Sequence, residues 1–328
     1  MNIYDMIIAK KIMGGGGGVT PTGTINITQN GDADVTNYAT AHVAVPQPSG
    51  KITISQNGTV DVTQYATADV NVSGGGGDDF GKLVDGSIVS AVIPSGTTKI
   101  KEYAFIGCNA LESVSIPPTV VTVEGSAFNN CYNMITADLP NSVTSMGTAV
   151  FDQCEKLARV NIPTGMSSIP SSSFRRCKAL TELTIPSNIL TVSGSAFNEC
   201  TSLERISFQD GCTELANDVF ASCSALVEVR LPSTLTKMGS SAFRYDKNLE
   251  SIDIPSGVTE IGNFAFGNCS KLRSITCRAV SPPIIGSNTF QSVPADAVIY
   301  VPAASVDTYK SGTYWSQRAS YIQAIPSA

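Results

Sequence analysis

The chain has 328 residues, which allows about two average domains and a large buried core. Hydrophobic residues make up 42% of it and charged residues only 15%, which excludes a highly charged disordered chain. The net charge of −6 provides no basic field for phosphates, so no nucleic-acid partner is expected. His42 is the single histidine, which leaves one candidate at most for His-dependent hydrolase or metal chemistry. We therefore predict that the chain is not an enzyme and takes no cofactor and no metal.

The first 23 residues are predicted to form a short amphipathic segment followed by a glycine linker. Asp5 stands where a Sec signal would have a basic region, and Lys10 and Lys11 interrupt the apolar stretch, so no signal peptide is expected. No apolar run in the chain approaches the ~20 residues of a membrane-spanning helix, so no membrane span is predicted.

Residues 24–73 contain two similar β-modules. The stretch TINITQNG, which begins at Thr24, is similar to KITISQNG, which begins 27 residues later at Lys51. The stretches DVTNYATA and DVTQYATA that follow are also 27 residues apart. Asn-Gly between alternating apolar residues predicts a hairpin in each module. Such small units bury little apolar area, so we expect residues 1–77 to pair with each other or to self-associate with other chains. Residues 74–79 are predicted to be a second glycine linker.

Residues 80–279 carry a strict repeat. Phenylalanine recurs every 23 residues, at Phe105, Phe128, Phe151, Phe174, Phe197, Phe220, Phe243 and Phe266. Each Phe opens the pattern F-x-x-C-x-x-L-x-x-I-x-I-P, with Asp246 the one exception at the Cys position. The L-x-x-I-x-I segment alternates like a short strand that the following proline ends.

A unit of this size cannot close a core alone, whereas equal units stacked in register build a continuous one. The sequence therefore predicts an α/β repeat solenoid with one short parallel strand per coil. The pattern resembles the BspA-type family of bacterial leucine-rich repeats over about residues 80–328, and the resemblance implies a leucine-rich-repeat horseshoe.

Residues 280–328 are predicted to cap the solenoid. Phe290 follows Phe266 by 24 residues instead of 23, so we place it in the cap and outside the regular Phe series. A strand from Ala297 and a short aromatic helix are expected, as in the terminal caps of BspA-type proteins. Trp315, the single tryptophan, is expected to cover the last coil. At the other end, residues 80–92 are predicted to form a hairpin-like or incomplete first coil.

The nine cysteines are predicted to be buried free thiols. There is no C-x-x-C pair, and seven cysteines follow a Phe at the same point of the coil, where a small thiol can pack and hydrogen-bond to the turn. Disulfides and a metal site are the alternatives. His42 is expected at the surface.

Outward positions of the strands form the candidate binding face, since the concave sheet is the extended surface of a solenoid. One column alternates in charge, and we expect its four members to form exposed ion pairs with their neighbours. The face has no aromatic side chains, so a polar protein or glycan partner is predicted rather than one that stacks sugar rings on aromatics. The candidate binding residues are Arg159, Asn161, Glu182, Thr184, Arg205, Glu228, Arg230 and Asp253.

Two overlapping functions follow from these patterns. The first is a non-enzymatic protein-binding or adhesion module, in which residues 1–77 attach the solenoid to something larger. The second is a phage or prophage virion component associated with a tail or fibre, because the N-terminal modules resemble those of certain phage structural proteins. An extracellular, cell-surface or virion location is expected, although neither a Sec signal nor a wall anchor after Ala328 is recognised.

Overall fold

The structure is a computed structural model. It describes residues 88–93 and 95–327 in full and, between residues 24 and 84, the backbone of the strands only. The predicted amphipathic segment and both glycine linkers lie outside the described residues, apart from Asp79. His42 lies on strand β3 (Thr40–Val43), but its side chain is outside the described residues.

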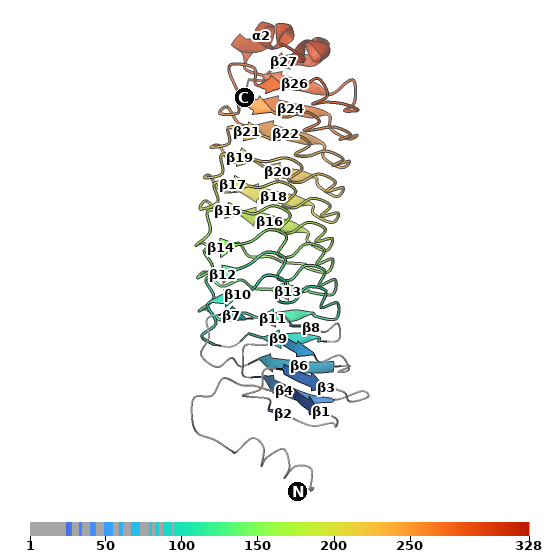
Figure 1. Cartoon of the computed structure of the whole chain (residues 1–328). Coiled ribbons are helices and arrows are strands. Elements are labelled where there is room, and N and C mark those ends of the chain that lie inside the picture. The colour runs from blue at the N-terminus through green and yellow to red at the C-terminus, as the bar shows by residue number, and fades with distance from the viewer. Residues whose placement is uncertain are drawn as a thin grey trace, which may run out of the picture.

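The coils stack into an elongated column whose strands run across its long axis (Figure 1). All described strand pairs are parallel, and where strands of the first position pair between β9 and β24 their partners lie 23 positions apart, as Ser113 and Thr136 do. The predicted repeat solenoid is therefore confirmed. Each coil also adds a second strand of two residues, which the sequence pattern did not indicate.

Two stacks of strands result, one from each strand position of the coil. The first stack contains β2 (Ala33–Asp34), β4 (Ser49–Ile54), β6 (Thr67–Val72), β9 (Ser90–Val92), β11 (Ser113–Ser115), β13 (Thr136–Ala137), β16 (Glu182–Ile185), β18 (Arg205–Phe208), β20 (Glu228–Arg230), β22 (Ser251–Ile254), β24 (Ser274–Cys277), β26 (Val298–Val301) and β27 (Ile322–Ala324). The second contains β7 (Asp79–Phe80), β10 (Lys99–Ile100), β12 (Thr122–Val123), β14 (Ser145–Met146), β15 (Ser168–Ile169), β17 (Thr191–Val192), β19 (Glu214–Leu215), β21 (Lys237–Met238), β23 (Glu260–Ile261) and β25 (Ile284–Ile285).

The Phe positions form one continuous aromatic stack inside the column. Neighbouring ring centroids from Phe105 to Phe290 lie 4.9–5.9 Å apart with interplanar angles of 18° or less. These distances fall within the favourable range for offset aromatic pairs. The rings from Phe105 to Phe266 are fully buried, so the stack forms the centre of the core.

Phe290 belongs to this stack, so its predicted place outside the regular Phe series is wrong. Its ring lies 5.9 Å from that of Phe266, with only 5° between their planes. The last coil accommodates its additional residue before the ring, because Ser274 pairs with Val298 and Glu260 with Ile284, both 24 positions further on. The longer coil therefore preserves the stacking position.

The strands between residues 24 and 84 pair in parallel, which contradicts the predicted hairpins. Strand β1 (Thr24–Ile27) pairs with β3, and β3 pairs with β5 (Thr59–Asp61). Strand β5 pairs in turn with β8 (Leu83–Val84). Strands β2, β4 and β6 continue the first stack directly into β9, and β7 pairs with β10 in the second stack. Alternating apolar residues on both sides of Asn-Gly are compatible with a hairpin and also with two strands that each pair with neighbouring coils. The strands here pair with neighbouring coils.

The C-terminal end is closed as predicted, by a strand and short helices with aromatic side chains. Strand β26 leads into η1 (Ala303–Ser305), α2 (Val306–Ser311) and η2 (Trp315–Tyr321). Trp315 is buried, contacts Phe290 at 5.5 Å between ring centroids, and donates from Nε1 to the carbonyl of Pro283 at 2.8 Å. The Tyr309 hydroxyl donates to the carbonyl of Ala279 at 2.8 Å. The cap thus covers the end of the aromatic stack. Within the described part of the chain, no helix is long and apolar enough to cross a membrane.

Candidate functional site

The predicted candidate residues lie on the outward face of the first stack. Asn161 is the exception, because its side chain bonds to Leu139 of the preceding coil. Arg205 and Arg230 are exposed on β18 and β20, while Ser207 between them is half-buried. Seven of the eight candidates line one groove of about 880 Å³, namely Arg159, Asn161, Glu182, Thr184, Arg205, Glu228 and Arg230. We call it the first groove. Asp253 lies instead on a second groove of about 340 Å³, which Arg230 also lines.

The first groove lies where the first stack is interrupted. Its strand order ends at β13 and resumes at β16, and the intervening coil has no strand from residue 157 to residue 163. No backbone hydrogen bond joins residues 158–162 to β16, although both segments are fully described. A second interruption separates β20 from β22, at the second groove. The predicted face is therefore divided, where the sequence indicated one continuous sheet.

Asn161 explains how the first interruption is stabilised. Its side-chain oxygen accepts from the backbone N–H of Leu139 at 2.9 Å, and its Nδ2 donates to the carbonyl of the same residue. A side-chain amide has the donor and acceptor of a peptide group, so it takes the place of a strand neighbour for Leu139. Ala158 still donates from its backbone N–H to the carbonyl of Ile135 at 3.3 Å, whereas the N–H groups of residues 159–162 make no backbone hydrogen bond. Asn161 thus has a structural contact that its prediction as a binding residue did not anticipate.

The alternating charge column forms only one of its predicted ion pairs. Arg205 Nε lies 3.7 Å from Glu228 Oε2, and Glu228 also contacts Arg230 at 2.7 Å. No ion pair reaches Arg159 or Glu182 among the described residues, so the predicted pairs Arg159–Glu182 and Glu182–Arg205 are not formed. The interruption separates the coil of Arg159 from β16, which accounts for the missing Arg159–Glu182 pair. Glu182 does lie opposite Arg205 on paired strands, but Arg205 contacts Glu204 and Glu228 instead.

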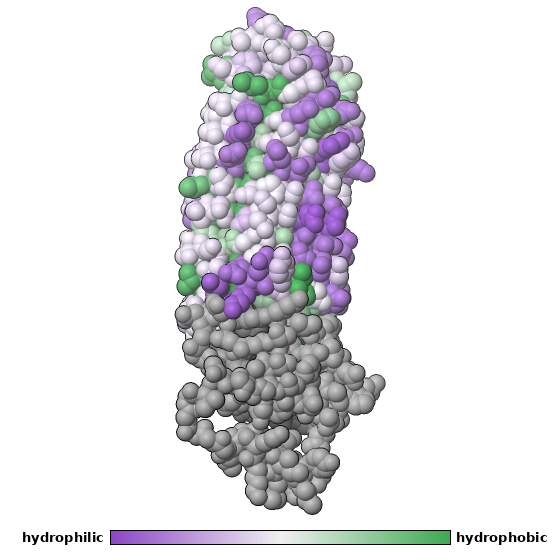
Figure 2. Space-filling model, in the orientation of Figure 1, coloured by the Kyte–Doolittle hydropathy of each residue, from purple (hydrophilic) through white to green (hydrophobic). Residues whose placement is uncertain are grey.

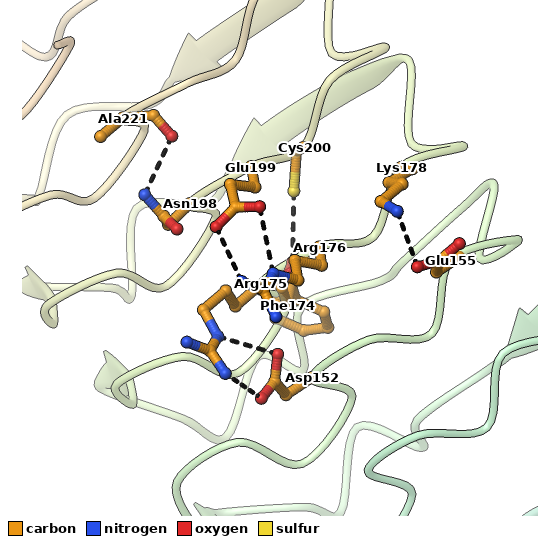
Figure 3. A network of polar contacts seen from close by, with 10 residues as sticks. All are labelled: Asp152, Glu155, Phe174, Arg175, Arg176, Lys178, Asn198, Glu199, Cys200 and Ala221. Atoms are coloured by element: carbon orange, nitrogen blue, oxygen red, sulfur yellow. Dashed lines mark hydrogen bonds and ion pairs between the residues drawn. The ribbon is translucent and has the colours of Figure 1, made fainter. Parts of the chain in front are cut away.

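A denser set of ion pairs lies on the turns that follow the Phe positions (Figure 3). Arg175 contacts the almost fully buried Asp152 through two hydrogen bonds of 3.0 and 2.8 Å, and Arg176 contacts Glu199 in the same two-pronged way at 3.1 and 3.2 Å. Each pair joins neighbouring coils. The hydrogen bond to Asp152 raises the pKa of Arg175, so the guanidinium stays charged. These turns are held to one another and offer few free charges.

The cysteines are buried free thiols, which confirms the prediction. From Cys131 onward, each thiol of the repeat position donates to the carbonyl of the Phe in the preceding coil, at 3.0–3.3 Å. Figure 3 shows one such bond, from Cys200 to Phe174. Burial raises the pKa of Cys200 to about 12 and that of Cys212 to about 11, so neither thiol ionises readily. Cysteine here serves packing rather than redox chemistry.

Asp246 occupies the cysteine position of its coil and is fully buried. Neither carboxyl oxygen has a hydrogen-bond partner, and burial raises its pKa well above the ordinary value. A buried ionised carboxylate without a partner is costly, so the neutral acid is the stable form. In the described residues, no group of three or more His, Cys, Asp or Glu side chains is placed to hold a metal ion.

The side chains that sequence reasoning missed are Val160 and Ile162. Both are only half-buried and line the first groove, whereas the counterparts of Val160 in the neighbouring coils, Ala137 and Leu183, are buried. The repeat pattern assigns all of them to the core. The one available signal was Asn161, the only asparagine at its repeat position.

Comparisons with known proteins agree with this architecture. The family described as "BspA type Leucine rich repeat region (6 copies)" matches residues 84–204 and 167–295. The chain belongs to this family of leucine-rich repeat proteins. No curated protein matches it significantly.

Solved structures of bacterial leucine-rich repeat proteins have a similar fold. The pneumococcal vaccine antigen PcpA is 15% identical with a TM-score of 0.50, and the match covers 93% of each chain. A leucine-rich cell surface protein from Faecalibacterium prausnitzii is 17% identical with a TM-score of 0.46, covering 94% of each chain. A T. pallidum leucine-rich repeat protein is 25% identical with a TM-score of 0.46, covering 49% of this chain and 78% of the other. The resemblance of the N-terminal modules to phage structural proteins stays a prediction.

Proposed function

We propose that this chain is a non-enzymatic module that binds proteins on a surface outside the cell and mediates adhesion. The observation that carries the proposal is the first groove, which combines exposed charges of both signs with partly exposed apolar side chains. Such a mixture of an apolar centre and a polar rim is typical of protein interfaces. Membership in the BspA-type family and the surface location named for the F. prausnitzii relative support the same role.

Figure 2 supports a specific interface rather than a broad hydrophobic one. On the face that it shows, hydrophobic residues occupy only small, separate areas of the coloured surface, and hydrophilic or near-neutral residues cover most of it. Without a large apolar patch on this face, affinity there must come from a few well-placed side chains. No aromatic side chain lines the first groove, which disfavours a partner that stacks sugar rings.

Binding of the fluorescently labelled full chain to epithelial and bacterial cells tests this proposal. We expect binding that falls when cell-surface proteins are removed with protease, and that weakens in a variant carrying Arg205→Ala and Arg230→Ala. Lys237→Ala, at a half-buried position on the second stack, serves as the control away from the first groove. Equal binding by the double variant and the wild type, or binding that survives protease treatment, would contradict a protein-binding face.

We also propose that residues 1–77 serve attachment or self-association. Strands β1 and β2 stand at the ends of their sheets among the described strands. End strands carry unpaired backbone groups that can accept a strand from another chain.

A further inference from the structure

The first groove has an apolar base in which Val160 is more exposed than its place in the repeat predicts. Val160 is half-buried, whereas its counterparts in the described coils, from Val114 to Ile275, have exposed fractions of 9% or less. Ile162 beside it is half-buried as well. Partly exposed aliphatic side chains gain free energy when a partner covers them. The interruption therefore provides an anchor point for an apolar side chain from outside.

Two charges of opposite sign flank this base without an ion-pair partner. Arg159 and Glu182 both line the groove and are exposed, and neither is held by another charged group among the described residues. The second groove differs, since its Asp253 is engaged by Arg278 through hydrogen bonds of 2.7–3.1 Å. Of these two grooves, only the first offers an unpaired cation together with an unpaired anion. Its charge pattern is complementary to a ligand that carries both signs.

The backbone beside these side chains is also available for binding. The N–H groups of residues 159–162 make no backbone hydrogen bond, and no ladder connects this segment to β16. A polypeptide carries alternating backbone donors and acceptors that can match such groups, as in other cases where an extended peptide binds beside a sheet. The geometry thus favours a peptide over a compact small molecule.

We infer that the first groove receives an extended segment of a partner protein. An apolar side chain of this segment contacts Val160 and Ile162, and its acidic and basic neighbours pair with Arg159 and Glu182. The inference rests on the proposed protein-binding function and specifies the place and chemistry of recognition. Asn161 is a positioning residue, because its amide bonds to Leu139 keep the adjacent backbone out of the sheet.

Selection of a phage-displayed library of random dodecapeptides on the full chain tests this inference. We expect enriched peptides with an apolar residue flanked by an acidic and a basic one. Arg159→Glu, at an exposed position, should weaken their binding about tenfold or more. A peptide whose acidic residue is replaced by lysine should regain affinity for that variant. Asn161→Thr, which removes the amide, should also weaken binding, while Arg278→Ala in the second groove should leave it unchanged.

The outcomes separate the inference from the broader function. Peptides that are sensitive to Arg278→Ala but not to Arg159→Glu would overturn the inference and retain a protein-binding face. Enriched peptides that no substitution on this face affects would overturn both. Glycans that bind on an array in an Arg159-dependent manner, without any peptide doing so, would replace the peptide by a sugar and so also overturn the inference.

Discussion

The side chain of Asn161 binds the backbone N–H and the backbone carbonyl of a single residue, Leu139. This pair of bonds substitutes a side chain for a strand at the first of the two interruptions of the first stack. The consequence extends to the next coil, because β16 then has no strand partner on that side. The side-chain amide of Asn161 therefore accounts for the first groove, on which the proposed function rests.

Removal of a central ring of the aromatic stack should destabilise the solenoid strongly. Phe197→Ala is expected to cost about 3–5 kcal/mol of unfolding free energy, through lost transfer energy and a cavity. Phe290→Ala should cost a comparable amount, because this ring stacks on Phe266 and also supports Trp315. Urea denaturation of both variants measures this. A Phe290→Ala cost well below half that of Phe197→Ala would place Phe290 outside the stack after all.

The thiols should be unreactive until the protein unfolds. Burial excludes reagents, and the pKa of about 12 at Cys200 keeps that thiol protonated. Mass spectrometry after treatment with a thiol alkylator should find no label on the native chain. The denatured, unreduced chain should carry nine labels, one for each free cysteine. Two or more blocked sites in the denatured sample would indicate disulfides.

Asp246 should make stability fall as the pH rises. Its folded-state pKa is raised by burial, so from about pH 4 upward the unfolded chain loses a proton that the folded chain retains. The free energy of unfolding therefore falls by about 1.4 kcal/mol per pH unit until the pH reaches the folded-state pKa of Asp246. Asp246→Cys removes this penalty and restores the thiol that can donate to the Phe220 carbonyl, the counterpart of the other Phe acceptors.

Chemical denaturation of wild type and Asp246→Cys between pH 4 and pH 8 measures this difference. We expect the advantage of the variant to grow with pH. Asp246→Asn, which is close in shape but does not titrate, is the control, and its stability should vary with pH in the same way as that of Asp246→Cys. A constant difference between wild type and Asp246→Cys over this range would mean that the carboxyl is not kept neutral in the folded chain.

The repeat made most of this fold predictable, whereas the groove depended on a departure from it. Phe and Cys recur at fixed spacing, and equal residues in equal coils must occupy equal environments, so the stack and the buried thiols followed from periodicity. Val160 fits the same pattern yet is half-buried, because its environment is determined by the hydrogen bonds of Asn161. A pattern of residue types does not reveal which backbone atoms a side-chain amide binds.

The Asn-Gly modules illustrate the same limit from the other direction. Their local sequence favours a hairpin, but β4 pairs in parallel with β2 and β6. Pairing between coils depends on strands distant in sequence, which local turn signals do not report. The predicted ion pair between Arg159 and Glu182 failed for a related reason, since it assumed an uninterrupted sheet.

Self-association should depend on the N-terminal strands. Asn26→Pro in β1 removes a backbone donor at the end strand of its sheet and should reduce the association. Light scattering of the full chain at rising concentration is expected to show oligomers that this variant lacks. A wild-type chain that stays monomeric throughout would remove self-association from the proposed role of residues 1–77.

Amide hydrogen exchange tests the interrupted sheet, and with it the groove, most directly. The N–H groups of residues 159–162 make no backbone hydrogen bond, whereas β18 is paired on both sides. We therefore expect residues 159–162 to exchange much faster than Arg205–Phe208 in the native full chain, and Asn161→Thr to narrow the difference if the backbone rejoins the ladder. Equal and slow exchange in both segments of the wild type would show a continuous sheet and contradict the groove.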